Sequence, residues 1–310
     1  MHYADRLEAA VAARESPCCV GLDPHLDLLP PEFAAAHDPA ASRAEVAAAV
    51  GDFLTRVVEL VADLVPAVKP QSAFFEALGA DGAVQWERVV ATAHAADLLV
   101  LGDVKRGDIG STAAAYARAF LTGGHGTPPE TLCDAITVHP YLGTDAIEPF
   151  VDAAEATGRG LYVLVRTSNP SSAELQARGD PPLSDQVAEL VDRWGAGCVG
   201  ERGWSAVGAV VGATHPGELA RLRERMPRAP LLVPGYGAQG GAAADVVGAF
   251  GAGLSGALVS SSRGVLFAHR ERPGAAWPDA CRDAARKMVR SIVAAVDRAS
   301  PGGPLAHPRP

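Results

Sequence analysis

The strongest chemical signal in this sequence is an apolar run that ends in charged residues. Residues 98–112 read LLVLGDVKRGDIGST, and the charged side chains that follow the apolar run include Asp103, Lys105 and Asp108. Four consecutive apolar residues predict a strand that is buried on both faces. Because alternate residues of a strand share a face, Asp103 and Lys105 should project together from its carboxyl end, with Asp108 in the following loop. Two carboxylates around one ammonium keep the lysine charged, which suits proton transfer or charge stabilisation.

The rarity of lysine favours catalytic chemistry over an ordinary salt bridge. A lone Asp-x-Lys at a strand end is more simply interpreted as a salt bridge. However, of 27 basic residues only Lys69, Lys105 and Lys287 are lysines. Arginine keeps its proton near neutral pH, whereas the pKa of a lysine can be tuned for acid or base work. Lys69 and Lys105 both end apolar runs, AVKPQ and GDVKR, so a requirement for lysine chemistry explains their placement better.

Bulk properties exclude several classes of protein. The chain has 310 residues, 48% of them hydrophobic, with a net charge of -9 and a pI near 5.5. An acidic protein of this kind lacks the basic excess that attracts nucleic acid or anionic lipid. Its five cysteines form no CxxC pair, so neither a disulfide framework nor a zinc site is indicated. With no apolar signal core and no run of membrane length, we expect a soluble cytoplasmic protein.

The alternation of apolar runs predicts the fold. Eight short strand-like runs alternate with helical segments, which indicates one (β/α)8 barrel over residues 1–300, with an extra amino-terminal helix at 5–15. Residues 301–310 are expected to be a disordered tail. An open doubly wound sheet is the alternative. The barrel is favoured because polar side chains recur at the carboxyl ends of the strands, where barrel active sites assemble: Asp23, Lys69, Asp103, Lys105, His139, Ser168 and Arg263.

Several connecting segments have individual predictions. Helices are expected at residues 40–65, 86–97 and 240–253. Residues 169–185, NPSSAELQARGDPPLSD, form a segment too long for a simple connection, and we predict that it is a loop that acts as a lid. His25, His139 and His215 fall near strand ends but have no recurring ligand spacing, so ordinary hydrogen-bonded histidines are expected there.

Two segments late in the chain predict a phosphate site. Barrels commonly bind phosphate on the loops after strands seven and eight. The first loop here, residues 234–241, reads PGYGAQGG, in which glycines permit close backbone approach and Gln239 adds a donor. The second, residues 260–264, reads SSSRG, in which Arg263 can bind phosphate bidentately and Gly264 can add a backbone N-H. Together they predict a phosphorylated ligand.

The combined motifs identify a family resemblance. DVKRGDIGST, together with GLD, VKP, VPGYGAQGG and SRG, resembles the orotidine 5'-phosphate decarboxylase family. The Arg-Gly within Asp-x-Lys-x-x-Asp, and the length, are similar to the longer bacterial branch (type 2). The likeness runs from Gly21 to Arg263, which is most of the barrel.

The resemblance implies a reaction and roles for the charged residues. It implies decarboxylation of orotidine 5'-monophosphate to UMP, the last step of de novo pyrimidine nucleotide synthesis, with no metal or organic cofactor. Lys105 would stabilise the C6 carbanion and protonate it. Asp103 would lie against the substrate carboxylate, and Lys69 would bridge Asp103 and the ribose. Asp108 and Thr112 would reach the ribose in a neighbouring subunit, so the resemblance also implies a homodimer with shared active sites.

The resemblance further implies a set of substrate-binding residues. Asp23 would bind ribose hydroxyls, and Ser168 would bind the pyrimidine edge. The base and phosphate would be lined by Pro234, Tyr236, Gln239, Arg263 and Gly264.

Two other functions are compatible with parts of the pattern. A sugar-phosphate decarboxylase or aldolase on the same barrel would use Asp-x-Lys-x-x-Asp with a magnesium ion, but a cation would be repelled by Lys69 at the end of the second strand. A non-catalytic sensor of nucleotide phosphates would keep Gln239 and Arg263 yet gain nothing from the Asp-Lys-Asp cluster.

Overall fold

A closed barrel of parallel strands forms the centre of the molecule. The computed structural model describes residues 1–214, 216–237 and 241–299, and within them eight strands pair in sequence order from β1 round to β8 and back to β1. The predicted (β/α)8 barrel is therefore confirmed, and the open sheet is wrong. The strands are β1 Cys18–Leu22, β2 Ala67–Pro70, β3 Leu99–Arg106, β4 Ala135–Val138, β5 Gly160–Arg166, β6 Val207–Val211, β7 Leu231–Val233 and β8 Ala257–Ser261.

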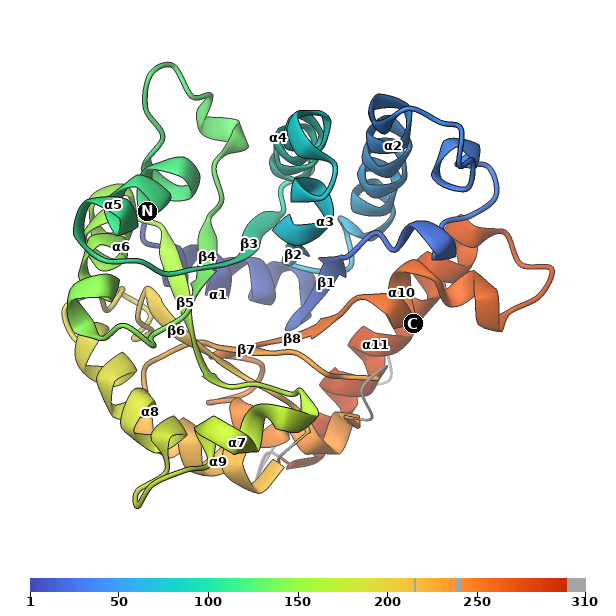
Figure 1. Ribbon diagram of the computed structural model, residues 1–310. Helices are drawn as coiled ribbons and strands as arrows, with labels where there is room; N and C mark the ends of the chain where they lie inside the picture. The colour runs from blue at the N-terminus through green and yellow to red at the C-terminus, as the bar shows by residue number, and fades with distance from the viewer. Residues whose placement is uncertain (215, 238–240, 300–310) are drawn as a thin grey trace.

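Helices surround the strands (Figure 1). The α-helices are α1 Tyr3–Arg14, α2 Arg43–Val61, α3 Ser72–Glu76, α4 Gly79–Ala95, α5 Gly110–Ala117, α6 Thr144–Thr157, α7 Ala173–Gln176, α8 Leu183–Trp194, α9 Pro216–Arg225, α10 Arg263–Leu266 and α11 Trp277–Ala299. Shorter helical turns are η1 Leu26–Leu28, η2 Ala34–Ala36, η3 Arg118–Thr122, η4 Pro129–Thr131, η5 Pro170–Ser172, η6 Ala243–Ala249 and η7 Ala268–Glu271. Among the helices of the described ranges, none is long and apolar enough to cross a membrane.

Alternation along each strand separates two hydrophobic cores. In β1, Cys18 and Val20 belong to the outer core between strands and helices, whereas Cys19 belongs to the inner core within the barrel. Every second side chain of a strand points into the barrel. Counted from Cys19 this series reaches Asp23 at the carboxyl end of β1, and counted from Ala67 it reaches Lys69 in β2. Inward-pointing residues are therefore apolar at the lower end of the barrel, where the strands begin. They are polar at its upper mouth, where the strands end.

Helix α1 closes the lower end of the barrel, which confirms the predicted amino-terminal helix. Tyr3, Leu7 and Val11 pack into the inner core. The hydroxyls of Tyr3 and Tyr162, both fully buried, lie 2.9 Å apart and satisfy each other's hydrogen-bonding groups. The lower end is thus a packed core, and ligand access is left to the opposite end.

The structure corrects several sequence-based boundaries. The helix expected at residues 40–65 begins at Arg43, where Ser42 and Glu45 form a capping box. The helix expected at 86–97 begins earlier, at Gly79, because a Gly- and Ala-rich first turn gave little amphipathic signal. The α-helix expected at 240–253 is wrong, since its described part forms the 3-10 turn η6. The predicted loop at 169–185 contains η5 and α7, and α8 begins within it. The predicted tail, residues 301–310, lies outside the described residues.

Asp134 joins three elements at the lower face. Its buried carboxylate accepts hydrogen bonds from Arg6 of α1, from His94 Nε2 of α4 at 2.9 Å, and from the Val100 backbone N-H of β3 at 2.8 Å. Burial alone would raise the pKa of Asp134, but His94 and Arg6 lower it to about 2. Burial alone would lower the pKa of His94, but its bond to Asp134 raises that pKa above the ordinary 6.5.

This pair predicts a pH dependence of stability. Because the pKa of His94 is higher in the folded chain than in the unfolded chain, its contribution is complete below about pH 6.5 and is lost as the pH rises through the folded pKa. Urea unfolding should therefore show that His94→Gln loses less unfolding free energy than the wild type between about pH 6 and about pH 9. An equal loss in both proteins would contradict the assignment.

Candidate active site

A cavity opens at the carboxyl ends of the strands. Its volume is 740 Å³. Most of the predicted site residues line it together, namely Asp23, Lys69, Asp103, Lys105, Ser168, Pro234, Tyr236 and Arg263. They come from the ends of β1, β2, β3, β5, β7 and β8, so one open cavity collects residues that are far apart in the sequence.

An irregularity in β3 aims the acidic and basic side chains. β3 advances from Gly102 to Arg106 while β4 advances only from Ile136 to Val138, so β3 bulges between these points. Within the bulge, Lys105 has a left-handed backbone with φ of 45°. Non-glycine residues adopt that conformation at a cost of about 1–3 kcal/mol. The side chains of Asp103 and Lys105 do meet as predicted, but through a bulged and strained strand rather than a regular one.

The Asp103 carboxylate is saturated by four donors. Its Oδ1 accepts from Lys105 Nζ at 2.5 Å and from Thr137 Oγ1 at 2.9 Å. Its Oδ2 accepts from Lys69 Nζ at 2.7 Å and from Gln71 Nε2 at 2.9 Å. An ionised carboxylate offers about four acceptor positions. All of them are used here, so the carboxylate is fixed in one orientation.

The surrounding charges keep this cluster ionised. Burial would raise the pKa of Asp103, yet the charges of Lys69 and Lys105 outweigh burial and hold the pKa far below its ordinary value. Burial would likewise lower the pKa of Lys69, but the charges of Asp103 and Asp23 raise it above its ordinary value. The site therefore presents a carboxylate anion between ammonium cations at neutral pH.

The two lysines differ in their exposure. The Lys69 side chain is 7% exposed, whereas that of Lys105 is 47% exposed at the cavity wall. Lys69 is thus a buried counter-ion for Asp103. Lys105 can approach a ligand while it keeps its contact with the carboxylate, which is the arrangement that charge stabilisation or proton donation requires.

Polar groups around this cluster are available to a ligand. Among the residues that the structure describes, Asp23 Oδ1 is buried and accepts no hydrogen bond, so it is an open acceptor at the cavity. Arg263 is exposed at the start of α10, which follows β8, and Pro234 and Tyr236 lie on the loop after β7. One cavity thus combines the basic Arg263, the open acceptor Asp23 and the Asp103 cluster, which is Asp103 with its two lysines.

Some predicted residues do not line this cavity. Asp108 and Thr112 lie on the loop after β3 and at the start of α5, and the Asp108 carboxylate accepts the Ile109 N-H at 2.8 Å. Gly264 borders a neighbouring hollow. Gln239 and His215 lie outside the described residues.

The sequence analysis missed several residues that hold Asp103 or line the cavity. Gln71 and Thr137 hold Asp103, and Thr167, Asn169 and Gln176 line the wall after β5. Gln71 and Thr137 occupy the inward-pointing positions two residues after Lys69 and Ala135, so the alternation along β2 and β4 could have identified them. His25 was set aside, yet it lines the cavity and packs edge-on against Phe74 at a centroid distance of 4.8 Å.

The Arg-Gly pair after Lys105 has a structural explanation. Arg106 forms an ion pair with Glu76 and lies over the ring of Phe120 at 5.6 Å. A side chain on Gly107 would collide with the His139 ring, because its Cβ would lie 2.2 Å from Nε2. The pair thus anchors the start of the loop that contains Asp108.

Within the described ranges, no three His, Cys, Asp or Glu side chains gather as a metal-binding group.

Comparison with known proteins identifies the family. Residues 16–276 match the model of the "Orotidine 5'-phosphate decarboxylase / HUMPS family". A Rhodopirellula baltica protein named orotidine 5'-phosphate decarboxylase is 45% identical over 302 residues, covering 94% of this chain and 99% of that protein.

Solved structures agree with this match. One from Streptomyces avermitilis has a TM-score of 0.77 at 41% identity and covers 95% of this chain and 96% of that one. The structure of Leishmania donovani OMP decarboxylase has a TM-score of 0.73 at 33% identity, with coverage of 95% and 98%.

The unequal burial of the lysines predicts unequal effects on stability. Lys69→Met should lower the unfolding free energy by about 3 kcal/mol, because it leaves the buried Asp103 carboxylate without its buried counter-ion. Lys105→Ala should change it by no more than about 0.5 kcal/mol, because Lys105 is half exposed. Urea unfolding of both variants measures the difference, and equal destabilisation would contradict the distinction between the lysines.

Proposed function

The chain belongs to the orotidine 5'-phosphate decarboxylase / HUMPS family, and we propose that it converts orotidine 5'-monophosphate to UMP and carbon dioxide in pyrimidine biosynthesis. The observation that carries the proposal is the Asp103 carboxylate, which is held ionised at the cavity wall with the Lys105 ammonium 2.5 Å away. That pair fits a reaction in which a carboxylate leaves and a carbanion is protonated.

The mechanism assigns separate tasks to the two charges. The bond between C6 and the substrate carboxylate breaks, and its electron pair stays on C6 as carbon dioxide departs. The Lys105 ammonium stabilises the developing charge, transfers a proton to C6, and regains a proton from solvent. Asp103 repels the substrate carboxylate in the ground state, and this repulsion is relieved as carbon dioxide leaves. Lys69 keeps Asp103 ionised and lies toward the ribose.

The remaining cavity residues are proposed to bind the substrate. Asp23 Oδ1, the open acceptor, binds a ribose hydroxyl. Ser168 binds the pyrimidine edge. Pro234, Tyr236 and Arg263 line the base and phosphate. Gly264, at the neighbouring hollow, adds its backbone N-H to the phosphate, and Gln239 is proposed as a further donor. Binding energy from the phosphate and ribose then holds the base against the Asp103 cluster. Neither a metal ion nor an organic cofactor takes part in this mechanism.

A homodimer with shared sites accounts for Asp108 and Thr112. Neither residue lines the cavity of its own chain. The loops after β3 and β4 expose large apolar side chains, with Ile109 58% exposed and Tyr141 75% exposed. Exposed apolar groups of this size favour an interface. In the proposed dimer, Asp108 and Thr112 reach the ribose in the partner's cavity.

The catalytic assignment predicts the effect of removing Lys105. In excess EDTA, the wild type should convert orotidine 5'-monophosphate to UMP, as followed by ultraviolet absorbance. Lys105→Ala should lower kcat by about a thousandfold or more, because both charge stabilisation and proton donation are lost. Arg193→Ala is the control and should keep full activity, because Arg193 is an exposed cation at the end of α8, outside this cavity. Turnover that requires added magnesium would instead favour the sugar-phosphate enzyme.

The shared site predicts complementation between inactive variants. Lys105→Ala and Asp108→Asn should each be inactive alone. After the two are mixed and the subunits are exchanged, about a quarter of the wild-type activity should return, because half of the dimers then contain one intact site. Activity that does not return, in a mixture shown to contain hybrid dimers, would place Asp108 in the site of its own chain.

A further inference from the structure

Arg166 is a buried cation at the end of β5, beside the cavity but not among its lining residues. It is 2% exposed. Its Nε donates to Glu218 Oε2 at 2.5 Å, and its Nη2 donates to Glu218 Oε1 at 3.4 Å. Glu218 lies in the first turn of α9, so this ion pair joins the end of β5 to the helix that follows the neighbouring strand β6. A guanidinium cannot lose its proton at neutral pH, and it therefore needs such a partner when buried.

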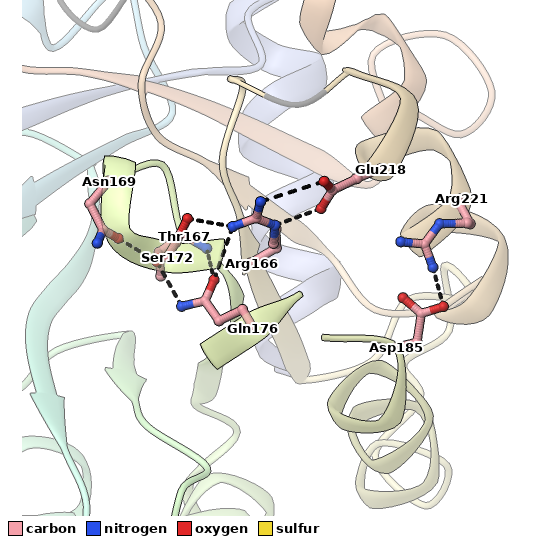
Figure 2. A network of polar contacts seen from close by, with 8 residues as sticks. All are labelled: Arg166, Thr167, Asn169, Ser172, Gln176, Asp185, Glu218 and Arg221. Carbon is pink, nitrogen blue, oxygen red and sulfur yellow. Dashed lines mark hydrogen bonds and ion pairs between the residues drawn. The ribbon is translucent and has the colours of Figure 1, made fainter. Parts of the chain in front are cut away.

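The opposite side of the same guanidinium holds the segment after β5. Arg166 Nη1 donates to Ser172 Oγ and lies 3.5 Å from Gln176 Oε1. Gln176 in turn clamps Thr167, because its Oε1 accepts the Thr167 N-H at 2.8 Å and its Nε2 donates to Thr167 Oγ1 at 2.8 Å. Figure 2 shows Arg166 between Glu218 on one side and Ser172 and Gln176 on the other.

This network continues into the cavity wall. Thr167 Oγ1 donates to Asn169 Oδ1 at 2.6 Å, and residues 167–169 line the cavity together with Gln176. Ser168, between them, lies against Gly212 so closely that a Cβ at position 212 would come within 2.9 Å of the Ser168 Cβ. The Gly212 N-H donates to the Arg166 carbonyl at 2.7 Å. Ser168 is thus held by the hydrogen-bonded residues Thr167 and Asn169 on either side of it in the chain, and by close contact with Gly212.

If the Arg166–Glu218 pair served only to join β5 to α9, the contacts of Arg166 with Ser172 and Gln176 would remain unexplained. Helices α8 and α9 are already joined by Asp185, which forms an ion pair with Arg221 (Figure 2). Asp185 also pairs with Arg225 at 3.1 Å. The Arg166–Glu218 pair differs because its guanidinium also binds the segment that forms the cavity wall.

We propose that Arg166 and Glu218 are positioning residues, whose ion pair holds Ser172 and Gln176 in place and thereby sets Thr167 and Ser168 for recognition of the pyrimidine base. The proposal rests on the function proposed above. Neither residue touches the substrate. Loss of the pair releases the segment 172–176 and misplaces the base relative to Lys105, which lowers catalysis through geometry rather than through charge.

Two variants and a matched control test the proposal. Glu218→Gln keeps a hydrogen-bonding side chain but removes the counter-charge of Arg166. Ser172→Ala leaves the ion pair intact and removes the shorter of the two contacts that Arg166 makes with the segment, so it keeps the test decisive if Glu218→Gln folds poorly. Arg221→Gln is the control, because Arg221 is one turn further along α9 and binds Asp185 instead. The measurements are kcat and KM for orotidine 5'-monophosphate, and hydrogen exchange of the Thr167 amide.

Glu218→Gln and Ser172→Ala should each lower kcat/KM by about tenfold. Both should speed exchange of the Thr167 amide, with slow exchange retained in the barrel core. Arg221→Gln should match the wild type in both measurements. A loss in Glu218→Gln and Ser172→Ala no greater than that in Arg221→Gln would overturn the proposal. If the wild type itself lacks decarboxylase activity, the proposed function fails, while the Thr167 exchange rates still decide whether the ion pair holds the wall.

Discussion

The site depends on one electrostatic arrangement, a buried carboxylate between two ammonium groups. Asp103 could not remain ionised in so buried a position without Lys69, and Lys69 could not remain buried and charged without Asp103. Their mutual stabilisation leaves Lys105, which is half exposed, as the charge that meets a ligand. Because Gln71 and Thr137 occupy the remaining acceptor positions of Asp103, the cluster is fixed before any ligand arrives.

The barrel supports this arrangement by separating stability from chemistry. The lower end is closed by α1, with the hydroxyls of Tyr3 and Tyr162 paired inside the core. Apolar inward-pointing residues then give way to polar ones at the upper mouth. The strained backbone of Lys105 is found there, in the bulge of β3, and its N-H is held by Thr137 Oγ1 at 3.0 Å. Strain at this point is sustained by the neighbouring strand, as expected where geometry serves function.

Sequence reasoning succeeded where a local pattern determines the outcome. The apolar runs predicted all the strands of the described barrel, and most of the polar residues predicted at the strand ends do line the cavity. It failed where partners come from different elements. Nothing in residues 98–112 reveals the bulge, and nothing near Arg166 reveals Glu218, because both depend on how neighbouring elements align. The helix expected at 240–253 failed for a local reason, since glycines interrupt that segment and η6 forms instead. Gln239 and residues 301–310 lie outside the part of the chain that the structure describes.

The most direct test of the central claim is to compare kcat of Asp103→Asn with its affinity for UMP, in folded protein. UMP lacks the carboxylate that Asp103 is proposed to repel. If the fixed negative charge drives decarboxylation, kcat should fall by about a hundredfold or more while the Kd for UMP stays within a few-fold of the wild-type value. A kcat close to that of the wild type, or a loss of kcat matched by an equal loss of UMP affinity, would contradict the account. In the first case the charge of Asp103 would be dispensable, and in the second it would serve only to shape the cavity.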